Sequence, residues 1–303
     1  MSVDFTVLAS GSRGNAALIR SGGVGLLIDL GLGPRVMAAR MSEVSAGWAG
    51  VASALLTHTH GDHVQSASLK MLASHGIPLY CHEGHRAELS RHAGFKYLER
   101  ADCVRSFDER PFLTPDGKRI EPIVLSHDGG PTFGFRIEAR SSRRGRPVAI
   151  GYLADTGCWT RATADCLTDV NVLGVEFNHD VEMQRRSGRA PYLIARNLGN
   201  RGHLSNDQGA GLVSAVLERS ARRTVRHVVL LHLSQQCNLP ALAINAAKAA
   251  VRDRGASARI HAASQWIPHP HLPVTPSRRQ PTVATAFPWE SDADEVPFRL
   301  TVE

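Results

Sequence analysis

The sequence predicts an α/β fold in which mixed β-sheets are covered by helices. First, short apolar runs rich in leucine or β-branched residues alternate with glycine and polar clusters, which is typical of strands. Second, segments with the apolar spacing of helices lie between many of these runs. Third, some runs are joined by short turns and others by helices, so both antiparallel hairpins and parallel strand–helix units are expected.

The first half of the chain supplies five predicted strands and three helical segments. The strands are apolar runs ended by glycine or polar residues, at residues 4–10, 15–20, 23–31, 52–58 and 77–82. Helical spacing predicts helices over residues 34–44, 64–76 and 84–94.

The second half repeats this scheme. Strands are predicted over residues 120–127, 132–140, 147–156, 171–180 and 225–234. The second and third of these are joined by the basic turn SSRRGR. Helices are predicted over residues 205–221 and 239–255.

The chain is expected to divide into a folded body, residues 1–265, and a Pro-rich tail, residues 266–303. The tail holds seven of the sixteen prolines, which predicts an irregular extension outside the fold. The tail carries a net charge of −2 (three arginines against five acids). Because the whole chain carries +7, the net charge of the body is +9. A basic body suits a polyanionic partner such as nucleic acid.

Composition indicates a globular protein of the cytoplasm. The chain is 43% hydrophobic and 21% charged, which allows a substantial core. No apolar stretch approaches the roughly 20 residues of a membrane helix, so no membrane partner is expected. No basic residue precedes the first apolar run, unlike a secretory signal. The five scattered cysteines form no Cys-x-x-Cys pair, which favours a reducing compartment.

The segment THTHGDH, residues 57–63, concentrates potential metal ligands after an apolar strand. It contains four within six positions: His58, His60, Asp62 and His63. In an extended chain residues i and i+2 point the same way, so His58 and His60 can hold one ion together. Gly61 turns the chain, so Asp62 and His63 can begin a second site. Imidazole and carboxylate without thiolate suit zinc, manganese or iron and argue against a closed structural zinc site.

Three later predicted strands each lead into another ligand-type residue. His127 follows PIVLS, Asp155 follows IGYLA, and His232 follows HVVLL. A single His or Asp after a strand is more often a cap or turn residue. Three of them, added to the THTHGDH cluster, indicate a shared metal site at one edge of the sheets.

THTHGDH followed by His127, Asp155 and His232 resembles the metallo-β-lactamase fold superfamily over about residues 5–265. The resemblance implies a four-layer αββα sandwich with two mixed β-sheets and a two-metal site along one sheet edge. The implied ligands are His58, His60 and His127 for the first metal, and Asp62, His63 and His232 for the second. Asp155 would bridge the two ions, and Asp29 in LLIDLG would support the histidine loop.

Further motifs resemble the nuclease and phosphodiesterase branches of this superfamily. They are LASGSRGNAALI near the start, and SHDGGPTFGFRIE followed by GYLADTG. VEFNHD, GHLSN and LLHLSQQCN together look like the YycJ/WalJ-like exonucleases, except that Cys237-Asn238 stands where an asparagine pair is expected. The resemblance implies a metal-dependent phosphodiesterase acting on nucleic acid, most simply a DNA exonuclease, with two zinc or manganese ions as cofactors.

The implied catalytic residues are Asp62, Asp155 and His203. Two ions would activate a water molecule and take up phosphate charge, and Asp155 would orient the nucleophile. His203 lies in RGHLSN, which is similar to the His-Ser-Thr segment of RNase Z. That resemblance implies contact with the scissile phosphate or protonation of the leaving oxygen. The helix predicted to begin beside His203 also favours phosphate binding.

An arginine-rich segment precedes His203 and is the candidate substrate-binding strip. Its arginines could follow a phosphate backbone, and they are Arg185, Arg186, Arg189, Arg196 and Arg201. Tyr192 could stack on a base. Glu176, Asn178 and His179 close a strand at the same expected edge, where they either contact substrate or pack against the core. A solvated charged face is the alternative interpretation of the strip.

Two other functions remain open at this point. One is a small-substrate hydrolase of the same fold, acting on a cyclic phosphodiester, a thioester or a lactone. The other is a binding or regulatory protein with a vestigial site, although a vestigial site has no reason to keep all seven ligands.

Overall fold

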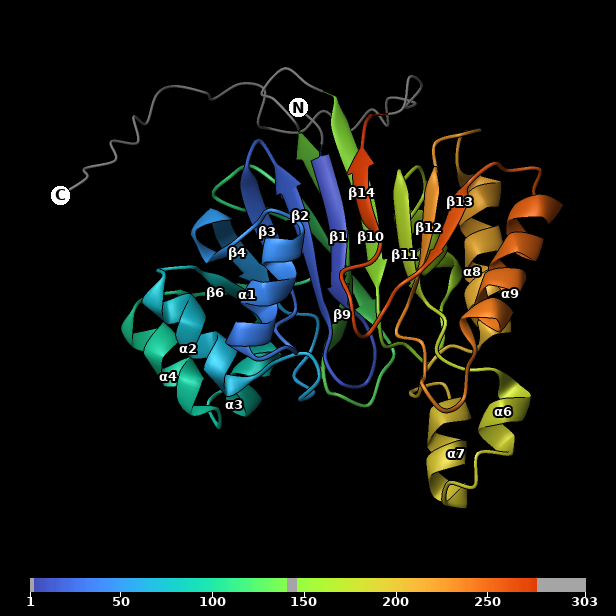
Figure 1. Ribbon diagram of the computed structural model, residues 1–303, viewed down its shortest axis with the longest axis horizontal. Coiled ribbons are helices and arrows are strands. Elements are labelled where there is room, and N and C mark those ends of the chain that lie inside the picture. Colours follow the sequence, from blue (N-terminus) through green and yellow to red (C-terminus); the bar gives the residue numbers. More distant parts are fainter. Residues whose placement is uncertain (1–2, 141–145, 277–303) are drawn as a thin grey trace.

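The protein, described by a computed structural model over residues 3–140 and 146–276, is built in four layers (Figure 1). Two seven-stranded sheets pack face to face, and helices cover the outer face of each. This arrangement confirms the predicted αββα sandwich. The turn SSRRGR falls mostly outside the described residues.

The first sheet has the order β14-β1-β2-β3-β4-β5-β6. Pairing is antiparallel from β14 to β3 and parallel from β3 to β6. The strands are β1 (Val3–Ala9), β2 (Ala16–Ser21), β3 (Val24–Ile28), β4 (Val51–Leu55), β5 (Leu79–His82), β6 (Val104–Phe107) and β14 (His271–Val274).

The second sheet has the order β13-β12-β11-β10-β9-β8-β7. Its pairing is parallel from β13 to β10 and antiparallel from β10 to β7. The strands are β7 (Phe112–Leu113), β8 (Arg119–Leu125), β9 (Thr132–Arg140), β10 (Pro147–Leu153), β11 (Val172–Glu176), β12 (His227–Leu231) and β13 (Arg259–Ala262).

Helices form the two outer layers and a separate pair. The first sheet is covered by α1 (Pro34–Glu43), α2 (Ser66–Ser74), α3 (Arg86–Leu89) and α4 (Ala93–Arg100). The second is covered by α5 (Arg161–Cys166), α8 (Asn206–Arg219) and α9 (Pro240–Asp253). The pair α6 (Val181–Arg185) and α7 (Pro191–Leu198) projects from the lower right of the molecule in Figure 1.

Three apolar clusters hold these layers together. Side chains from both sheets, such as Phe5, Phe135 and Tyr152, fill the space between the sheets. A second cluster lies between the first sheet and α1 to α4, and a third between the second sheet and its helices. Each fully buried large apolar side chain contributes about 1.5–3 kcal/mol to folding. The two sheets are therefore fixed firmly enough to hold side chains at their shared edge.

The structure contains elements that the sequence pattern did not predict. The predicted helix over residues 84–94 is divided into a 3₁₀ turn and α3, and α4 begins only at Ala93. Strands β6 and β13 are short and partly polar, and β7 has only two residues, so their periodicity is weak.

The predicted tail needs one correction at its start. His271–Val274 forms β14, which pairs antiparallel with β1, so the fold continues past the predicted boundary at residue 265. Pro273 is tolerated there because β14 is an edge strand, where a missing N–H breaks no ladder. The rest of the predicted irregular tail, residues 277–303, lies outside the described residues. Within the described ranges, no helix is long and apolar enough to cross a membrane.

Candidate metal centre

The predicted ligands come together at one edge of the two sheets because their strands run in the same direction. Residues 57–63 follow β4, His127 follows β8, Asp155 follows β10, and His232 follows β12. The carboxyl ends of strands that run together meet at one edge, which is where open α/β sheets usually place their functional groups. The sequence prediction of a shared edge is therefore met by the fold.

Three histidines form the first cluster of this edge. His58, His60 and His127 each offer a ring nitrogen, and these atoms lie within 4.8 Å of one another. His60 Nδ1 lies 3.3 Å from His127 Nε2. His58 is fully buried, whereas His60 is partly exposed, so the cluster opens to solvent on the His60 side.

The second cluster contains Asp62, His63, Asp155 and His232, whose ligand atoms also lie within 4.8 Å of one another. Asp155 Oδ2 is 2.6 Å from His63 Nε2 and 3.4 Å from His58 Nε2. Its Oδ1 contacts His232 Nδ1. The carboxylate of Asp155 therefore faces both clusters, as expected for a bridging residue.

The polar atoms of this centre fit divalent cations. His58 Nε2 and His232 Nε2 are buried and have no hydrogen-bond partner. A buried polar atom without a partner is costly, and most are satisfied in native proteins. Imidazole nitrogens and carboxylate oxygens that converge without thiolates are ligands for zinc or manganese. A bound cation would satisfy these atoms.

Burial and charge set the protonation of these groups. Burial, followed by the proximity of His63, holds the pKa of His58 well below its ordinary value. Although burial opposes protonation of His63, the carboxylates of Asp29 and Asp155 raise its pKa to about 10. Burial also disfavours the charge of Asp155, yet His232 and His63 hold the pKa of that carboxyl well below its usual range. The carboxylates thus draw positive charge to this edge, and a metal cation would take the place of those protons.

Asp29, predicted to support the histidine loop, is fully buried at the end of β3. Its Oδ2 accepts a 2.8 Å hydrogen bond from His63 Nδ1, and its Oδ1 accepts one from the Thr57 backbone N–H. The carboxylate therefore fixes the ring orientation of His63 and leaves Nε2 directed to Asp155.

Left-handed backbone is concentrated at this centre. Asp29, Asp155 and His232 all have positive φ values, of 63°, 56° and 54°. This conformation costs free energy for residues other than glycine, and such strain gathers at functional sites. The chain turns sharply after each strand, which aims the side chain across the sheet edge.

Glu176 lies at this edge, as the sequence predicts, but its role as the carboxylate that connects several loops was not predicted. Its Oε1 lies 2.7 Å from His203 Nδ1 and 3.0 Å from His232 Nδ1. Its Oε2 accepts hydrogen bonds from the backbone N–H groups of Thr156 and Leu204. Glu176 thus connects the loops that carry Asp155, His203 and His232. The available signal was an acid closing the otherwise apolar run VLGVE at the same strand end.

His203 lies beside both clusters. Its ring centroid is 5.1 Å from that of His127 and 5.1 Å from that of His232. Burial lowers the pKa of His203, but the Glu176 carboxylate more than offsets this and raises it. Ser205 and Gln208 form a capping box at the start of α8, which fixes the helix N-terminus close to His203.

The predicted substrate-binding arginines all lie near or on the α6–α7 pair, and each of the five has a partner. Arg185 and Arg186 are exposed and lie 3.1 Å and 3.5 Å from Glu182 oxygens. Arg189 bonds the Gln236 side chain, and Arg201 the His127 carbonyl. Tyr192 is 71% exposed. These side chains form a solvent-facing surface that continues to the metal edge.

Arg196 of α7 pairs with Asp128, which directly follows His127. Asp128 Oδ1 lies 3.5 Å from His127 Nε2, so this ion pair ties the α6–α7 pair to the metal edge. Asn178, predicted to touch substrate, is buried and donates a 2.9 Å hydrogen bond to the His232 carbonyl. Its side chain positions the His232 loop.

Gly129 packs against the first cluster closely enough to give a specific prediction. A Cβ at this position would lie 2.6 Å from His58 Cδ2 and 3.0 Å from a His60 ring carbon. Gly129→Ala should therefore displace both rings and weaken metal binding by roughly ten- to a hundredfold, as loss of ligand support does elsewhere. Metal affinity is measured by competition with a chromogenic chelator. Gly61→Ala is the matched control, because its Cβ would meet nothing within 4 Å. Equal affinities for the two variants would contradict this packing.

Comparison with known proteins agrees with the fold. Residues 26–233 match the family described as the beta-lactamase superfamily domain, and the chain belongs to that family. It is 29% identical over 241 residues to exodeoxyribonuclease WalJ of Streptococcus pneumoniae, covering 79% of this chain and 84% of the relative. It is 25% identical over 261 residues to exodeoxyribonuclease YycJ of Bacillus anthracis, covering 84% and 91%. The metallo-β-lactamase fold protein YhfI of Bacillus subtilis has a similar structure, with a TM-score of 0.63, 16% identity, and coverage of 89% and 99%.

Proposed function

We propose that this protein is a metal-dependent nuclease that removes nucleotides from DNA ends, using two zinc or manganese ions. The observation that carries the proposal is that Asp155 faces two ligand clusters at one sheet edge, with His203 beside both. The exodeoxyribonucleases to which the chain is similar over most of its length support DNA as the substrate.

Each residue of the centre has a role in this proposal. One ion would be held by His58, His60 and His127. The other would be held by Asp62, His63 and His232, and Asp155 would contact both ions. When bound, two such ions activate water as a nucleophile and neutralise phosphate charge. Asp62 and Asp155, which face that centre, would orient the nucleophile.

His203 would act on the phosphate rather than on a metal. Glu176 accepts from His203 Nδ1, so the imidazole is held in one orientation with Nε2 left for substrate. That nitrogen would donate to a phosphate oxygen or protonate the leaving oxygen. Because Glu176 also contacts His232, substrate handling and ligand position depend on one carboxylate.

The α6–α7 pair would bind the polynucleotide beyond the cleaved bond. Arg185, Arg186 and Arg196 are exposed on this pair, Arg189 is half-buried, and Tyr192 offers an uncovered ring for stacking. Arg196 is paired with Asp128 at the metal edge, whereas Arg185 and Arg186 share the exposed carboxylate of Glu182. Arg189 bonds the neutral Gln236 side chain, so these three arginines are the better phosphate contacts.

An activity panel tests the proposal. The purified protein is incubated with end-labelled single- and double-stranded DNA and RNA, with manganese or zinc, beside a small chromogenic phosphodiester. Stepwise release of nucleotides from DNA ends is expected, with slower cleavage of RNA. Rapid hydrolysis of the small ester with no cleavage of any polynucleotide would favour the small-substrate hydrolase instead.

The arginines of the α6–α7 pair give a second prediction. Replacing Arg185, Arg186 and Arg189 by glutamine should weaken oligonucleotide binding. The slope of log affinity against log salt concentration should become shallower by roughly 0.7–0.9 per lost phosphate contact. Hydrolysis of the small phosphodiester should barely change, because the metals hold its single phosphate. Binding is measured by fluorescence anisotropy over a range of salt concentrations.

A matched control variant removes Arg91, Arg105 and Arg110, which are also exposed and paired with nearby acids. Its net charge equals that of the test variant. An unchanged salt slope in the test variant, or an equal change in the control, would show that the α6–α7 surface is only a solvated face.

A further inference from the structure

A basic cavity lies at the opposite end of the second sheet from the metal centre. It has a volume of about 380 Å³ and is lined by Arg223, Val225, Arg226, His227, Ser257 and Arg259. His227 begins β12 and Arg259 begins β13, whereas His232 follows the end of β12. Five strand residues span about 16 Å, so this cavity is separate from the metal centre.

The lining of this cavity, here called the β12–β13 pocket, gathers positive charge. Three arginines line it, and none of its lining residues is acidic. Two nitrogens of Arg226 are fixed, because they donate to Thr275 Oγ1 and the Pro276 carbonyl at 2.8 Å and 2.7 Å. Arg259 lies next to Arg226, because the backbone N–H of Arg259 donates a hydrogen bond to the Arg226 carbonyl. Burial, followed by the charges of Arg259 and Arg226, lowers the pKa of His227.

Arg223 reaches this pocket from a strained turn. Its φ is +67°, in the left-handed region that disfavours residues with a Cβ. Strain of this kind persists where the surrounding structure requires a particular direction of the chain. Here the turn between α8 and β12 brings Arg223 into the pocket lining that Arg226 and Arg259 also form.

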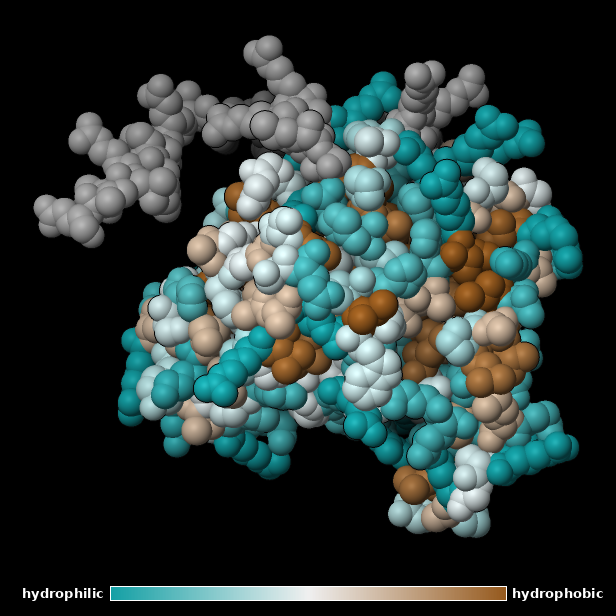
Figure 2. All heavy atoms as spheres, viewed as in Figure 1, coloured by the Kyte–Doolittle hydropathy of each residue, from teal (hydrophilic) through white to brown (hydrophobic). Residues whose placement is uncertain are grey.

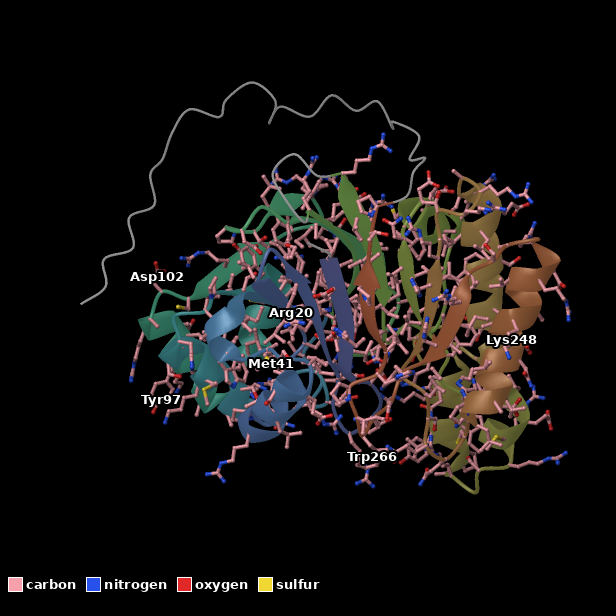
Figure 3. The ribbon with its side chains drawn as sticks, turned by 45° about the horizontal axis from the view of Figure 1, so that its top comes forward. Arg20, Met41, Tyr97, Asp102, Lys248 and Trp266 are labelled. Atoms are coloured by element: carbon pink, nitrogen blue, oxygen red, sulfur yellow. The ribbon has the colours of Figure 1, made fainter. Side chains whose placement is uncertain are left out.

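A second cavity, of about 620 Å³, shares Arg259 with the β12–β13 pocket. Its lining is mixed: Val251, Ala256, Ala258 and Ile260 are apolar, and Lys248 and Arg252 add positive charge. Figure 2 shows hydrophobic residues next to hydrophilic ones over α9 and β13. Figure 3 places Lys248 on the outer side of α9. A ligand that spans both cavities would need an anionic group and an adjoining apolar part.

We propose that the β12–β13 pocket binds a nucleotide, with its phosphate on Arg223, Arg226 and Arg259. The planar guanidinium group matches phosphate oxygens and can bind them through two parallel hydrogen bonds. The base and sugar lie against the apolar wall of the neighbouring cavity, near Val251 and Ile260. This site stands independently of the metal centre and of any activity there. The phosphate belongs either to a free nucleotide or to a nucleotide within a polynucleotide.

Nuclear magnetic resonance of the ¹⁵N-labelled full chain locates the site. The probe is deoxyadenosine monophosphate, and the reporters are the amides of residues 223–227 and 257–260. Saturable shifts of these amides are expected, separate from any shifts of residues 57–63. The double variant Arg223→Asn, Arg259→Gln should weaken this binding about tenfold or more, since hydrogen bonds to charged groups are lost. Asparagine tolerates the left-handed turn at residue 223.

The matched control is Arg161→Gln, Arg222→Gln, which removes the same charge from exposed arginines outside the pocket lining. Its affinity for the nucleotide should stay within about twofold of the parent, because only screened, longer-range charge is lost. A loss equal to that of the double variant would overturn the proposal, since net charge alone would then explain binding.

Two further probes distinguish the source of the phosphate. If an end-blocked oligodeoxynucleotide binds more tightly at the same amides, the natural ligand is a polynucleotide. If the mononucleotide binds more tightly, the natural ligand is a free nucleotide. Inorganic phosphate alone should bind more weakly than either, because it lacks the apolar part. The proposal is overturned if none of the three probes shifts these amides at millimolar concentration.

Discussion

Replacing Asp155 by asparagine is expected to abolish phosphodiester hydrolysis, with a fall of roughly a thousandfold or more in turnover. Its two oxygens face the two ligand clusters, so the amide would offer one weak oxygen where two charged ones are needed. At least one bound ion per chain should also be lost. Turnover and elemental metal content of the same preparation measure both effects.

The control for this variant is Asp165→Asn, an isosteric change at an exposed carboxylate that pairs with Arg219. It should keep full activity and metal content. Circular dichroism should show that both variants remain folded, since the three apolar clusters are untouched. An active Asp155→Asn protein with two bound ions would remove Asp155 from the proposed mechanism.

Replacing His203 by alanine should lower turnover on oligonucleotides by about a hundredfold while leaving metal content unchanged. The imidazole lies beside both clusters and is held by Glu176 rather than by the predicted ligand sets. If His203 protonates the leaving oxygen, a p-nitrophenyl phosphodiester should be much less affected, because its leaving group needs no proton. The two substrates are therefore compared with the same variant.

Loss of one ion from His203→Ala would contradict this assignment. Asp155, Glu176, His203 and His232 also have ligand atoms within 4.8 Å of one another, so the alternative is chemically concrete. His203 would then be a ligand, and His232 the doubtful one. Glu176→Gln separates the roles further, because glutamine can accept from the Thr156 and Leu204 backbone but not also from both rings.

The metal edge could be predicted from sequence because each ligand follows an apolar strand directly. Predicting the positions of His127, Asp155 and His232 required only the end of each preceding strand and the direction of that strand. Both can be inferred from the local sequence. Glu176 was different, since its partners His203 and His232 are 27 and 56 residues away. A buried acid that joins several loops leaves no periodic pattern in the sequence.

The elements that escaped prediction are those whose stability comes from tertiary contacts. β14 is a four-residue edge strand with a proline, and it is defined by its pairing with β1. The α6–α7 helices have only five and eight residues, and α7 buries none of them, so these helices are too short to stand out in the sequence. Arg196 shows the same limit: its position in an arginine-rich segment suggested phosphate binding, whereas the fold pairs it with Asp128.

The most direct test of the two-metal nuclease is a metal titration of chelated protein, followed with an end-labelled DNA substrate. Manganese or zinc is added stepwise, and bound metal and released nucleotide are measured in each sample. The predicted result is an inactive metal-free protein whose activity rises with bound metal and saturates at about two ions per chain. Full activity after exhaustive chelation, with no metal found by elemental analysis, would contradict the account.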